Sequence, residues 1–401
     1  MKVEIERGAF AEIVGRAAKA LAVRPATPIL AGLLLSADAE RGTLRAAAFD
    51  FEFAVRATAP AQVGESGMAL VSGRLLAEIT RVLPDVPVEL ALEGGHLALR
   101  CGAYRYTLAC LPVPEYPALP TVPAAVGTVG GAALATAAAR AAMAAERDDT
   151  LPFLTGARLE FGPEHLRLVS TDRYRLARVD VPWQPADAGR VAWAEGGEGA
   201  AGADVQLSAL VPARALLEAA KLLPGAEQVR IGLGDGLLGL AVGGLELTLR
   251  QLDGEFIRYA QLFPDEYTGE VVLEVAALTE AIRAIALVAE RHTPVRLELE
   301  PGQVTVSAGS GDHAVADVTL EVGYEGEPVV IAANPTYLLD GLGALGTPYA
   351  RLRYPARVRP VFLSPLTAPQ AAGGDTDAST DNGSEALFHY LFIPSRGGER
   401  G

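Results

Sequence analysis

Three stretches of this chain share one residue pattern, and this internal repetition constrains the fold more than any other feature. Residues 71–84 align without a gap with residues 211–224, and residues 333–346 form a third copy. Apolar residues in each copy recur with helical spacing, which predicts one amphipathic helix per copy. In the first copy Arg74, Glu78 and Arg81 share the polar face. The residues expected on its buried face are Leu75, Leu76, Ile79, Val82 and Leu83.

Two further sets of matching segments keep the same order in each copy. Members of one set follow an Ala-rich stretch and lead into an apolar strand; they are residues 22–30, 145–154 and 289–297. The other set is residues 49–55, 171–177 and 311–316. Copies roughly 120–145 residues apart indicate one structural unit repeated three times. We predict an α+β fold of three similar domains, each with two helices packed on antiparallel sheets. Their predicted bounds are residues 1–120, 126–254 and 265–401.

Alternating apolar and polar residues predict β-strands joined by tight turns. The clearest strand patterns are residues 86–92, 97–111, 303–306 and 387–393, with turns expected at 93–95 and 309–312. Segments bearing Pro and Tyr, residues 113–120 and 256–264, are expected to cross between domains. Residues 194–203 and the acidic, polar residues 370–384 are expected to form flexible loops, since they cannot bury enough apolar surface to become ordered.

Catalytic and metal-binding patterns find no support in this sequence. Residues 232–239 are Gly-rich, but a strand pattern follows them rather than the helix that a phosphate-binding loop needs, so we predict a hairpin turn. Asp50 and Glu52 lie near Arg56, and we expect them on a solvated strand face. The five histidines are scattered, and two cysteines, Cys101 and Cys110, are too few for a four-cysteine zinc site. We therefore predict no catalytic residues, no metal and no cofactor.

Composition limits the location of the protein and raises an objection to nucleic-acid binding. No apolar run approaches the ~20 residues of a membrane span, and no signal-peptide core follows the N-terminus, so we expect a cytoplasmic protein without membrane contact. The formal net charge of −15 is opposite to that of a conventional DNA-binding protein. One segment, residues 171–177, combines charged and aromatic residues; it is either an exposed turn and strand or a binding site.

The triple repeat, with the motifs at residues 24–30, 147–154, 171–177 and 334–340, resembles the bacterial DNA polymerase III beta subunit family, the beta sliding clamps. The resemblance covers essentially the whole chain and is greatest to actinobacterial members. It implies three clamp domains per chain and a head-to-tail homodimeric ring around duplex DNA. Such a ring is not an enzyme. It tethers the DNA polymerase III alpha subunit and is engaged by the clamp loader, in both cases through clamp-binding peptides.

A ring of this kind removes the objection raised by the acidic composition. It holds DNA by topology, so weak, sequence-independent phosphate contacts from a locally basic hole suffice. The residues that the resemblance places toward DNA are Arg24, Arg74, Arg81, Arg147, Arg214, Lys221, Arg283 and Arg291, with Arg16, Lys19 and Arg140 as further candidates. The third copy has Thr336, Asp340 and Gly343 at the matching helix and so lacks basic residues there. For any single arginine the alternative is a solvated helix face.

The resemblance also implies a peptide pocket and a dimer interface. An apolar cleft with few polar anchors suits a short peptide bearing Leu or Phe. The pocket residues implied are Leu154, Thr171, Arg173, Tyr174, Arg175, Leu176, Ile257, Gln261, Leu262, Asn334, Tyr337, Val358, Pro360, Ile393, Pro394, Ser395 and Arg396. At the dimer interface, the strand around Tyr106 and Leu108 would pair with the region around Leu287.

Two departures from the family pattern fall in the pocket region. Ile257 stands where a proline is usual, and the chain has Ile393-Pro394-Ser395-Arg396 where the family ends in a Met-Pro-Val/Met-Arg-Leu-like segment. One alternative is therefore a divergent, duplicate clamp whose altered pocket tolerates a peptide-like inhibitor that targets clamps. Alternatives of another class are a protein-binding scaffold that does not hold DNA, and an enzyme built on a repeated α/β scaffold.

Overall fold

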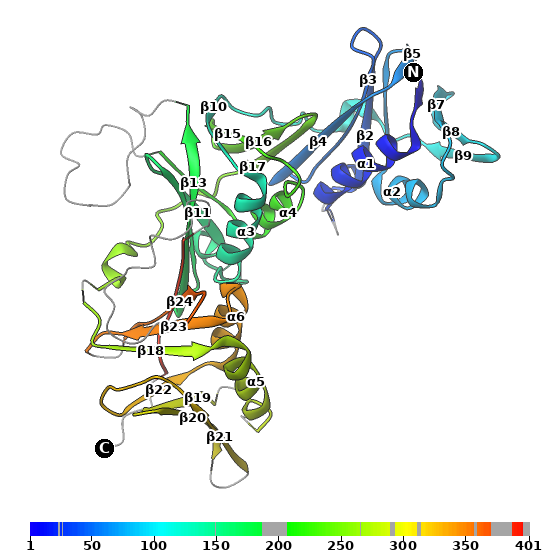
Figure 1. Cartoon of the computed structure of the whole chain (residues 1–401). Helices are drawn as coiled ribbons and strands as arrows, with labels where there is room; N and C mark the ends of the chain where they lie inside the picture. Colours follow the sequence, from blue (N-terminus) through cyan, green and yellow to red (C-terminus); the bar gives the residue numbers. More distant parts are fainter. Residues whose placement is uncertain are drawn as a thin grey trace. The chain divides into compact units, whose positions relative to one another are not determined.

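The computed structural model describes residues 1–22, 25, 27–148, 150–186, 207–264, 266–288, 293–310, 314–356, 359–369 and 387–395. The two loops predicted at residues 194–203 and 370–384 lie outside this part of the chain. So do four predicted site residues, Arg24, Arg291, Val358 and Arg396. The chain divides into two compact units, which we describe separately (Figure 1). Unit 1 is Met1–Ala135, Trp183–Arg190 and Arg214–Leu252, and unit 2 is Thr136–Pro182, Val191–Ala213 and Asp253–Gly401.

Unit 1 contains two antiparallel sheets, and its first two helices pack together. The longer sheet has the strand order β10-β15-β16-β17-β4-β3-β2-β6, and the shorter has the order β5-β1-β7-β8-β9. Helix α1, Arg7–Ala17, packs on β3 and β4 and against α2, Gly73–Val82. The strands of the longer sheet are β10 (Ala125–Val129), β15 (Val229–Gly234), β16 (Leu237–Val242), β17 (Leu245–Arg250), β4 (Phe53–Pro60), β3 (Thr43–Phe49), β2 (Gly32–Asp38) and β6 (Gly67–Ser72). Those of the shorter are β5 (Gln62–Glu65), β1 (Lys2–Ile5), β7 (Val88–Glu93), β8 (His96–Cys101) and β9 (Tyr104–Ala109).

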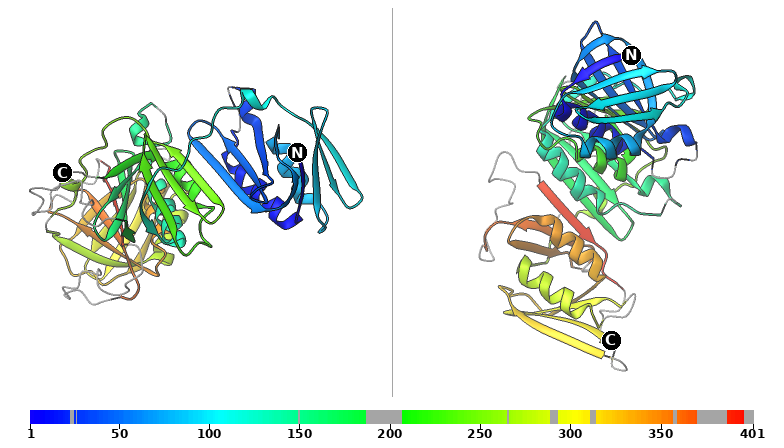
Figure 2. Two further views of the ribbon diagram at one scale, coloured as in Figure 1. Left: turned by 90° about the horizontal axis from the view of Figure 1, so that it is seen from above. Right: turned by 90° about the vertical axis from the view of Figure 1, so that its right-hand side faces the viewer.

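Unit 2 repeats this arrangement. One sheet has the order β18-β23-β24-β25-β13-β12-β11-β14, and another the order β21-β20-β19-β22. Helices α5 (Val275–Ile285) and α6 (Pro335–Leu345) lie side by side, with α5 against β20 and β21 and α6 against β24 and β25 (Figure 2). The strands of the first sheet are β18 (Gly269–Glu274), β23 (Tyr349–Tyr354), β24 (Val361–Leu366), β25 (Leu387–Phe392), β13 (Arg175–Pro185, in this unit up to Pro182), β12 (His165–Thr171), β11 (Gly156–Phe161) and β14 (Ser208–Pro212). The other strands are β21 (Ala314–Glu321), β20 (Gln303–Ser310), β19 (Val295–Glu300) and β22 (Val329–Ala333).

Two further helices belong to the described chain. They are α3, Gly131–Ala142, and α4, Ala213–Ala220. Together with α2 and α6, α4 completes the set of helices predicted from the three matching stretches. The hairpin expected at residues 232–239 is confirmed by β15 and β16, whose turn places Asp235 and Gly236 at positive φ. The single strand expected at residues 97–111 is wrong: Gly102, at φ 58°, turns the chain so that β8 and β9 pair as a hairpin.

The predicted buried face of α2 is only partly correct. Leu76, Ile79 and Leu83 are buried, but Leu75 is 46% exposed and Val82 is 67% exposed. The buried side chains follow i, i+3 and i+7 spacing. Thr80 is buried on the same face, and its hydroxyl donates to the Ala77 carbonyl at 3.0 Å, so the buried polar group has a partner. Leu75 and Val82 are spaced by seven residues as well, so they form a second, exposed line beside the buried one.

The sequence predicted Asp50 and Glu52 on a strand face, but they lie in the turn between β3 and β4. One Asp50 carboxylate oxygen accepts hydrogen bonds from the Glu52 and Phe53 amides at 3.0 and 2.7 Å. Phe51, between them, has φ 77°, in the left-handed region. The short Asp50 side chain therefore closes the turn through these hydrogen bonds instead of pairing with Arg56. Arg56 instead donates to the carbonyls of Leu119 and Pro120 in the first predicted crossing.

A buried polar cluster lies on the sheet face of unit 2. The Asp180 carboxylate accepts from Arg167 at 2.7 and 2.9 Å and from Arg178 at 3.3 and 2.7 Å. Burial favours the neutral acid, but these hydrogen bonds outweigh it and lower the pKa of Asp180 to about 2. On β25, burial and the nearby Arg178 charge lower the pKa of His389 to about 4. The imidazole ring meets Phe263 edge-on, with centroids 6.2 Å apart, and is neutral at pH 7.

We predict that unit 2 loses stability between pH 6.5 and pH 4 because of His389. In the unfolded chain this histidine takes up a proton near pH 6.5, whereas in the folded chain it resists protonation down to about pH 4. The free energy of unfolding should therefore fall by up to about 3 kcal/mol across this range. Urea unfolding at stepped pH measures it. The control is His389→Phe, which keeps a ring against Phe263 and should flatten the pH dependence; an unchanged slope in this variant would contradict the assignment.

Candidate functional site

The turn between β12 and β13 organises the site, and its geometry matches the turn between β3 and β4. One Asp172 carboxylate oxygen accepts from the Tyr174 and Arg175 amides at 3.0 and 2.9 Å, as Asp50 does in the first repeat. Arg173 has φ 77°, the value found for Phe51. The Thr171 hydroxyl is buried, donates to the Arg175 carbonyl at 2.7 Å and accepts from the Arg173 amide at 3.1 Å. The backbone of this turn is thus fixed on both sides.

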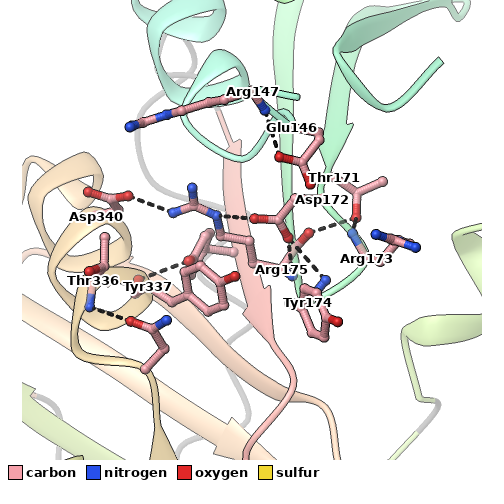
Figure 3. A network of polar contacts seen from close by, with 12 residues as sticks. Glu146, Arg147, Thr171, Asp172, Arg173, Tyr174, Arg175, Thr336, Tyr337 and Asp340 are labelled. Atoms are coloured by element: carbon pink, nitrogen blue, oxygen red, sulfur yellow. Dashed lines mark hydrogen bonds and ion pairs between the residues drawn. The ribbon is translucent and has the colours of Figure 1, made fainter. Parts of the chain in front are cut away.

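Arg175 lies between two carboxylates from different parts of the chain (Figure 3). Its Nε donates to Asp172 at 2.8 Å and its Nη1 donates to Asp340 on α6 at 2.6 Å, while the side chain itself is almost fully buried. Burial opposes the charge, but the hydrogen bond to Asp340 and the neighbouring acids prevail and raise the pKa of Arg175. The guanidinium also stacks on the Tyr337 ring, 4.7 Å from its centroid. Burial and the Asp172 charge raise the pKa of Tyr337.

The end of β25 brings the C-terminal residues to the same place. The Ile393 amide donates to the Tyr174 carbonyl at 2.7 Å, and the Ser395 amide donates to the Ala332 carbonyl at 2.8 Å. The buried Tyr390 hydroxyl donates to the Tyr337 carbonyl at 2.8 Å. Tyr174 and Ile393 remain 54% and 39% exposed, so two apolar side chains face solvent beside the Arg175 network. Of the sequence-predicted residues, Thr171, Arg175 and Tyr337 are thereby linked by a hydrogen bond and a ring contact, and Tyr174 is linked to Ile393 by a backbone hydrogen bond.

The other predicted pocket residues lie around the Arg175 network without being part of its side-chain bonds. Leu154 and Leu176 are buried core side chains, and Pro394 is also buried. Asn334 caps α6, since its side-chain oxygen accepts from the Thr336 amide at 2.9 Å. Ile257, Gln261 and Leu262 lie in the crossing at residues 256–264, and Pro360 precedes β24. Among the described residues, no hydrogen bond, ion pair or ring contact joins these four to the Arg175 network.

Four of the basic residues predicted to face DNA are exposed on helices. Arg74 and Arg81 lie on α2 and Arg214 on α4, in unit 1, whereas Arg283 lies on α5, in unit 2. Lys221 follows α4 and pairs with Glu218 at 2.6 Å. Arg147 is exposed in the loop after α3 and its backbone amide donates to the Glu146 carboxylate at 2.8 Å. Of the further candidates, Lys19 is exposed and Arg16 pairs with Glu12 at 2.6 Å.

Arg140 does not belong to this group, contrary to the expectation from sequence. Its Nε and Nη2 donate to the carbonyls of Ala344 and Leu345 at 2.9 Å each, and the guanidinium lies 5.2 Å from the Phe388 ring centroid. Carbonyls in the last turn of a helix lack partners within the helix and attract cations. Arg140 therefore caps the C-terminus of α6.

The predicted dimer-interface residues differ in exposure. Leu108 is buried and Tyr106 half-buried on β9, which is the last strand of its sheet. Leu287, just after α5, is 86% exposed, the largest fraction among the exposed large apolar side chains of the described chain. β21 is the last strand of its own sheet, and its Val315 is 63% exposed. Both strand edges offer backbone groups for pairing.

Three residues of the site were not predicted as site residues from the sequence: Asp172, Asp340 and Tyr390. An acid three residues before Arg175 was a usable signal for Asp172, because Asp often closes a turn in this way. Tyr390 carried no such signal, since most of its neighbours in the strand are apolar. Among the described residues no group of three or more His, Cys, Asp or Glu side chains is arranged to hold a metal ion. No helix in the described part is long and apolar enough to span a membrane.

Models of three protein domains match this chain in succession. They are the N-terminal, central and C-terminal domains of the DNA polymerase III beta subunit, over residues 1–120, 128–257 and 260–373. The chain is 42% identical over 401 residues to the beta sliding clamp of Streptomyces coelicolor, covering 99% of both chains. It is 39% identical over 356 residues to the beta sliding clamp homolog GriR of Streptomyces muensis, covering 88% of this chain and 91% of the relative.

The fold is also found among solved structures. The chain superposes with a TM-score of 0.84 on the Pseudomonas aeruginosa DnaN sliding clamp, a structure bound to griselimycin, at 24% identity. The superposition covers 99% of this chain and all of the other.

We predict that Arg175→Met destabilises the protein by about 3–5 kcal/mol, because it leaves buried Asp172 without a counter-charge. Chemical unfolding measures the loss. Asp340→Asn is the matched control: Asp340 is partly exposed and an amide oxygen still accepts from Arg175, so we expect a cost of about 1 kcal/mol or less. Equal effects of the two substitutions would contradict the dominant role given to the buried pair.

Proposed function

The chain belongs to the DNA polymerase III beta subunit family and is a sliding clamp, and we propose that it encircles duplex DNA as a head-to-tail homodimer. The supporting observation is that the three beta-subunit domain models match in order along the chain, alongside 42% identity to the S. coelicolor clamp over 99% of both chains. Members of this family are processivity factors rather than enzymes. On this proposal the protein acts in the cytoplasm, where bacterial DNA is replicated.

The DNA-facing surface in this proposal consists of helix-borne basic residues. Support comes from the exposure of Arg74, Arg81, Arg214 and Arg283, whose guanidinium groups are available for phosphate contact. Arg24, Arg147, Lys221 and Arg291 complete the proposed set. Such contacts are independent of sequence and weaken with salt, which suits a protein that slides. The net charge of −15 is compatible with this, because only the local charge around the DNA enters the interaction.

The peptide pocket in this proposal is the region around the Arg175 network. The polymerase alpha subunit and the clamp loader would place a short segment with Leu or Phe side chains against Tyr174 and Ile393, which are exposed apolar groups held by the backbone bond between them. Tyr337 would supply a fixed aromatic surface, because Arg175 and Tyr390 hold its ring and its backbone. The remaining residues predicted for the pocket are proposed to line it.

A second proposal is that this chain is a duplicate clamp with a modified pocket. The specific observation in its favour is the 39% identity to the clamp homolog GriR, with Ile257 and Ile393-Pro394-Ser395 as departures in the pocket region. Griselimycin, which is bound to the P. aeruginosa clamp in its crystal structure, would then bind this chain weakly. Titration of griselimycin against this protein and a housekeeping clamp compares the two; equal affinities would contradict the proposal.

Retention on circular DNA tests the clamp function. After clamp-loader treatment, the protein should remain on a nicked circular plasmid through gel filtration and should leave once the plasmid is linearised, because a ring can slide off an end. Equal retention on circular and linear DNA would indicate ordinary phosphate binding. No retention on either would favour a protein-binding scaffold that does not hold DNA.

We predict that Leu287→Asp converts the dimer into a monomer. A carboxylate in place of this exposed apolar side chain would be desolvated at the interface without a counter-charge. Sedimentation equilibrium should give twice the chain mass of 41.7 kDa for the parent and a single chain mass for the variant. Val82→Asp, also on an exposed apolar residue but outside the proposed interface, is the control and should stay dimeric; dissociation of both variants would contradict the assignment.

A further inference from the structure

The second crossing, residues 256–264, is fastened to the sheet of unit 2 by a buried tyrosine. The Tyr259 hydroxyl donates to a Glu160 carboxylate oxygen on β11 at 2.6 Å, and both residues are only 2% exposed. The other Glu160 oxygen lies 2.9 Å from the Nε of Arg158, so the acid is held from the side of the sheet. Burial and the Glu160 charge raise the pKa of Tyr259, so the hydroxyl keeps the proton that it donates.

Tyr259 also begins the turn that carries two residues predicted for the peptide pocket, Gln261 and Leu262. It directly precedes the short 3-10 helix Ala260–Leu262, and its carbonyl accepts from the Leu262 amide at 2.9 Å. The side chain of Tyr259 is therefore tied to the sheet, while its backbone is tied to the turn. As long as the hydroxyl bond is in place, the two turn residues keep a fixed position relative to β11.

The far end of the crossing is held by ring contacts. Phe263 meets side chains of β13, β25 and β24: the Arg178 guanidinium at 5.5 Å from its ring centroid, and the rings of His389 and Phe362 at 6.2 and 5.6 Å between centroids. Ring contacts of this kind persist over a range of tilts and offsets, whereas a hydrogen bond weakens steeply away from its preferred distance and angle. The bond of the Tyr259 hydroxyl is therefore the contact that sets the position of the crossing.

The first crossing, residues 113–120, offers a matched case in unit 1. Its Tyr116 is also buried, and the hydroxyl accepts from the Phe49 amide at 3.1 Å and donates to the Gly32 carbonyl at 3.3 Å. Two bonds from Arg56 to backbone carbonyls hold the same crossing. No residue predicted for the peptide pocket belongs to this segment. Loss of the Tyr116 hydroxyl is therefore a control that removes the same group from a crossing outside the proposed pocket.

We propose that Tyr259 is a positioning residue of the peptide pocket. By donating to Glu160, it holds the second crossing where the turn residues can meet a bound peptide. The inference rests on the proposed pocket and adds to it a buried residue that the peptide does not reach. Without the hydroxyl bond, the crossing would occupy this position for only part of the time. The measured affinity then falls in proportion to the fraction of molecules in which the pocket is complete.

The test compares the full-length parent protein with Tyr259→Phe and Tyr116→Phe. Each substitution removes one buried hydroxyl and keeps the ring, so both should lower the midpoint of thermal unfolding by a few degrees. Binding of a fluorescein-labelled hexapeptide containing Leu-Phe is measured by fluorescence anisotropy at a temperature where all three proteins are folded. It should be about fivefold weaker in Tyr259→Phe, as for a crossing in place about a fifth of the time, and unchanged in Tyr116→Phe.

Hydrogen exchange followed by mass spectrometry tests the crossing itself. Amides of residues 256–264 should exchange faster in Tyr259→Phe than in the parent, and a saturating amount of the hexapeptide should slow them again. A residue with a role in stability alone would lower the unfolding midpoint and would leave both the affinity of the folded protein and this local exchange unchanged.

The outcomes that overturn the inference differ from the outcome that overturns the pocket. Parent-like affinity in Tyr259→Phe, or unchanged exchange over residues 256–264, would show that Tyr259 does not position this side of the pocket, and the pocket itself would stand. An equal loss of binding in Tyr116→Phe would assign the effect to general stability and would also overturn the inference. If the parent protein does not bind the hexapeptide, the proposed pocket fails and the inference fails with it.

Discussion

The arrangement of the site depends on one buried guanidinium. Arg175 compensates Asp172 within its own turn and Asp340 on α6, and it supports the Tyr337 ring as well. Taking a charge out of water is costly unless its partners remain in place. Hydrogen bonds therefore hold three segments together. Arg175 joins the turn after β12 to Asp340 on helix α6, and the Tyr174 carbonyl of the same turn joins it to the Ile393 amide in the tail after β25. A surface of exposed Tyr174 and Ile393 is fixed in position without being itself buried.

The fold was largely predictable because its signals are local. Helical periodicity identified α2, α4 and α6, and turn residues identified the hairpin of β15 and β16. The errors arose where several registers satisfied the same pattern. Leu75 and Val82 are as well spaced as the buried residues of α2, and only the packing of that helix decides between the two lines. The strand pattern of residues 97–111 continues across Gly102, so the glycine was the one indication of a hairpin there.

Some residues of the Arg175 network were predictable from the sequence, but the hydrogen bonds that connect them were not. Resemblance identified Arg175 and Tyr337, but the pairing of Arg175 with Asp340 joins positions 165 residues apart, which no local pattern reveals. Arg140 shows the opposite error. It sits on a helix, as Arg74 and Arg283 do, and its role as a cap for α6 depends on carbonyls more than 200 residues away. Charge at a helical position therefore indicates availability for DNA only when no distant acceptor lies within reach.

Repetition gives this chain the same scaffold more than once, and side-chain differences decide what each copy does. The turns of Asp50 and Asp172 have one backbone conformation, but one carries Phe51 over Phe49 and the other carries Arg173 beside Thr171. Likewise the acid at one helical position is Glu218 in the second repeat, where it pairs with Lys221, and Asp340 in the third, where it pairs with Arg175. The backbone was retained because hydrogen bonds from an aspartate close the turn whatever residue follows it. The residue after the aspartate can therefore differ between repeats. Phe51 packs on Phe49 in the first repeat, whereas Arg173 is exposed in the second. The second turn is also the one whose Tyr174 carbonyl accepts from the Ile393 amide of the C-terminal tail.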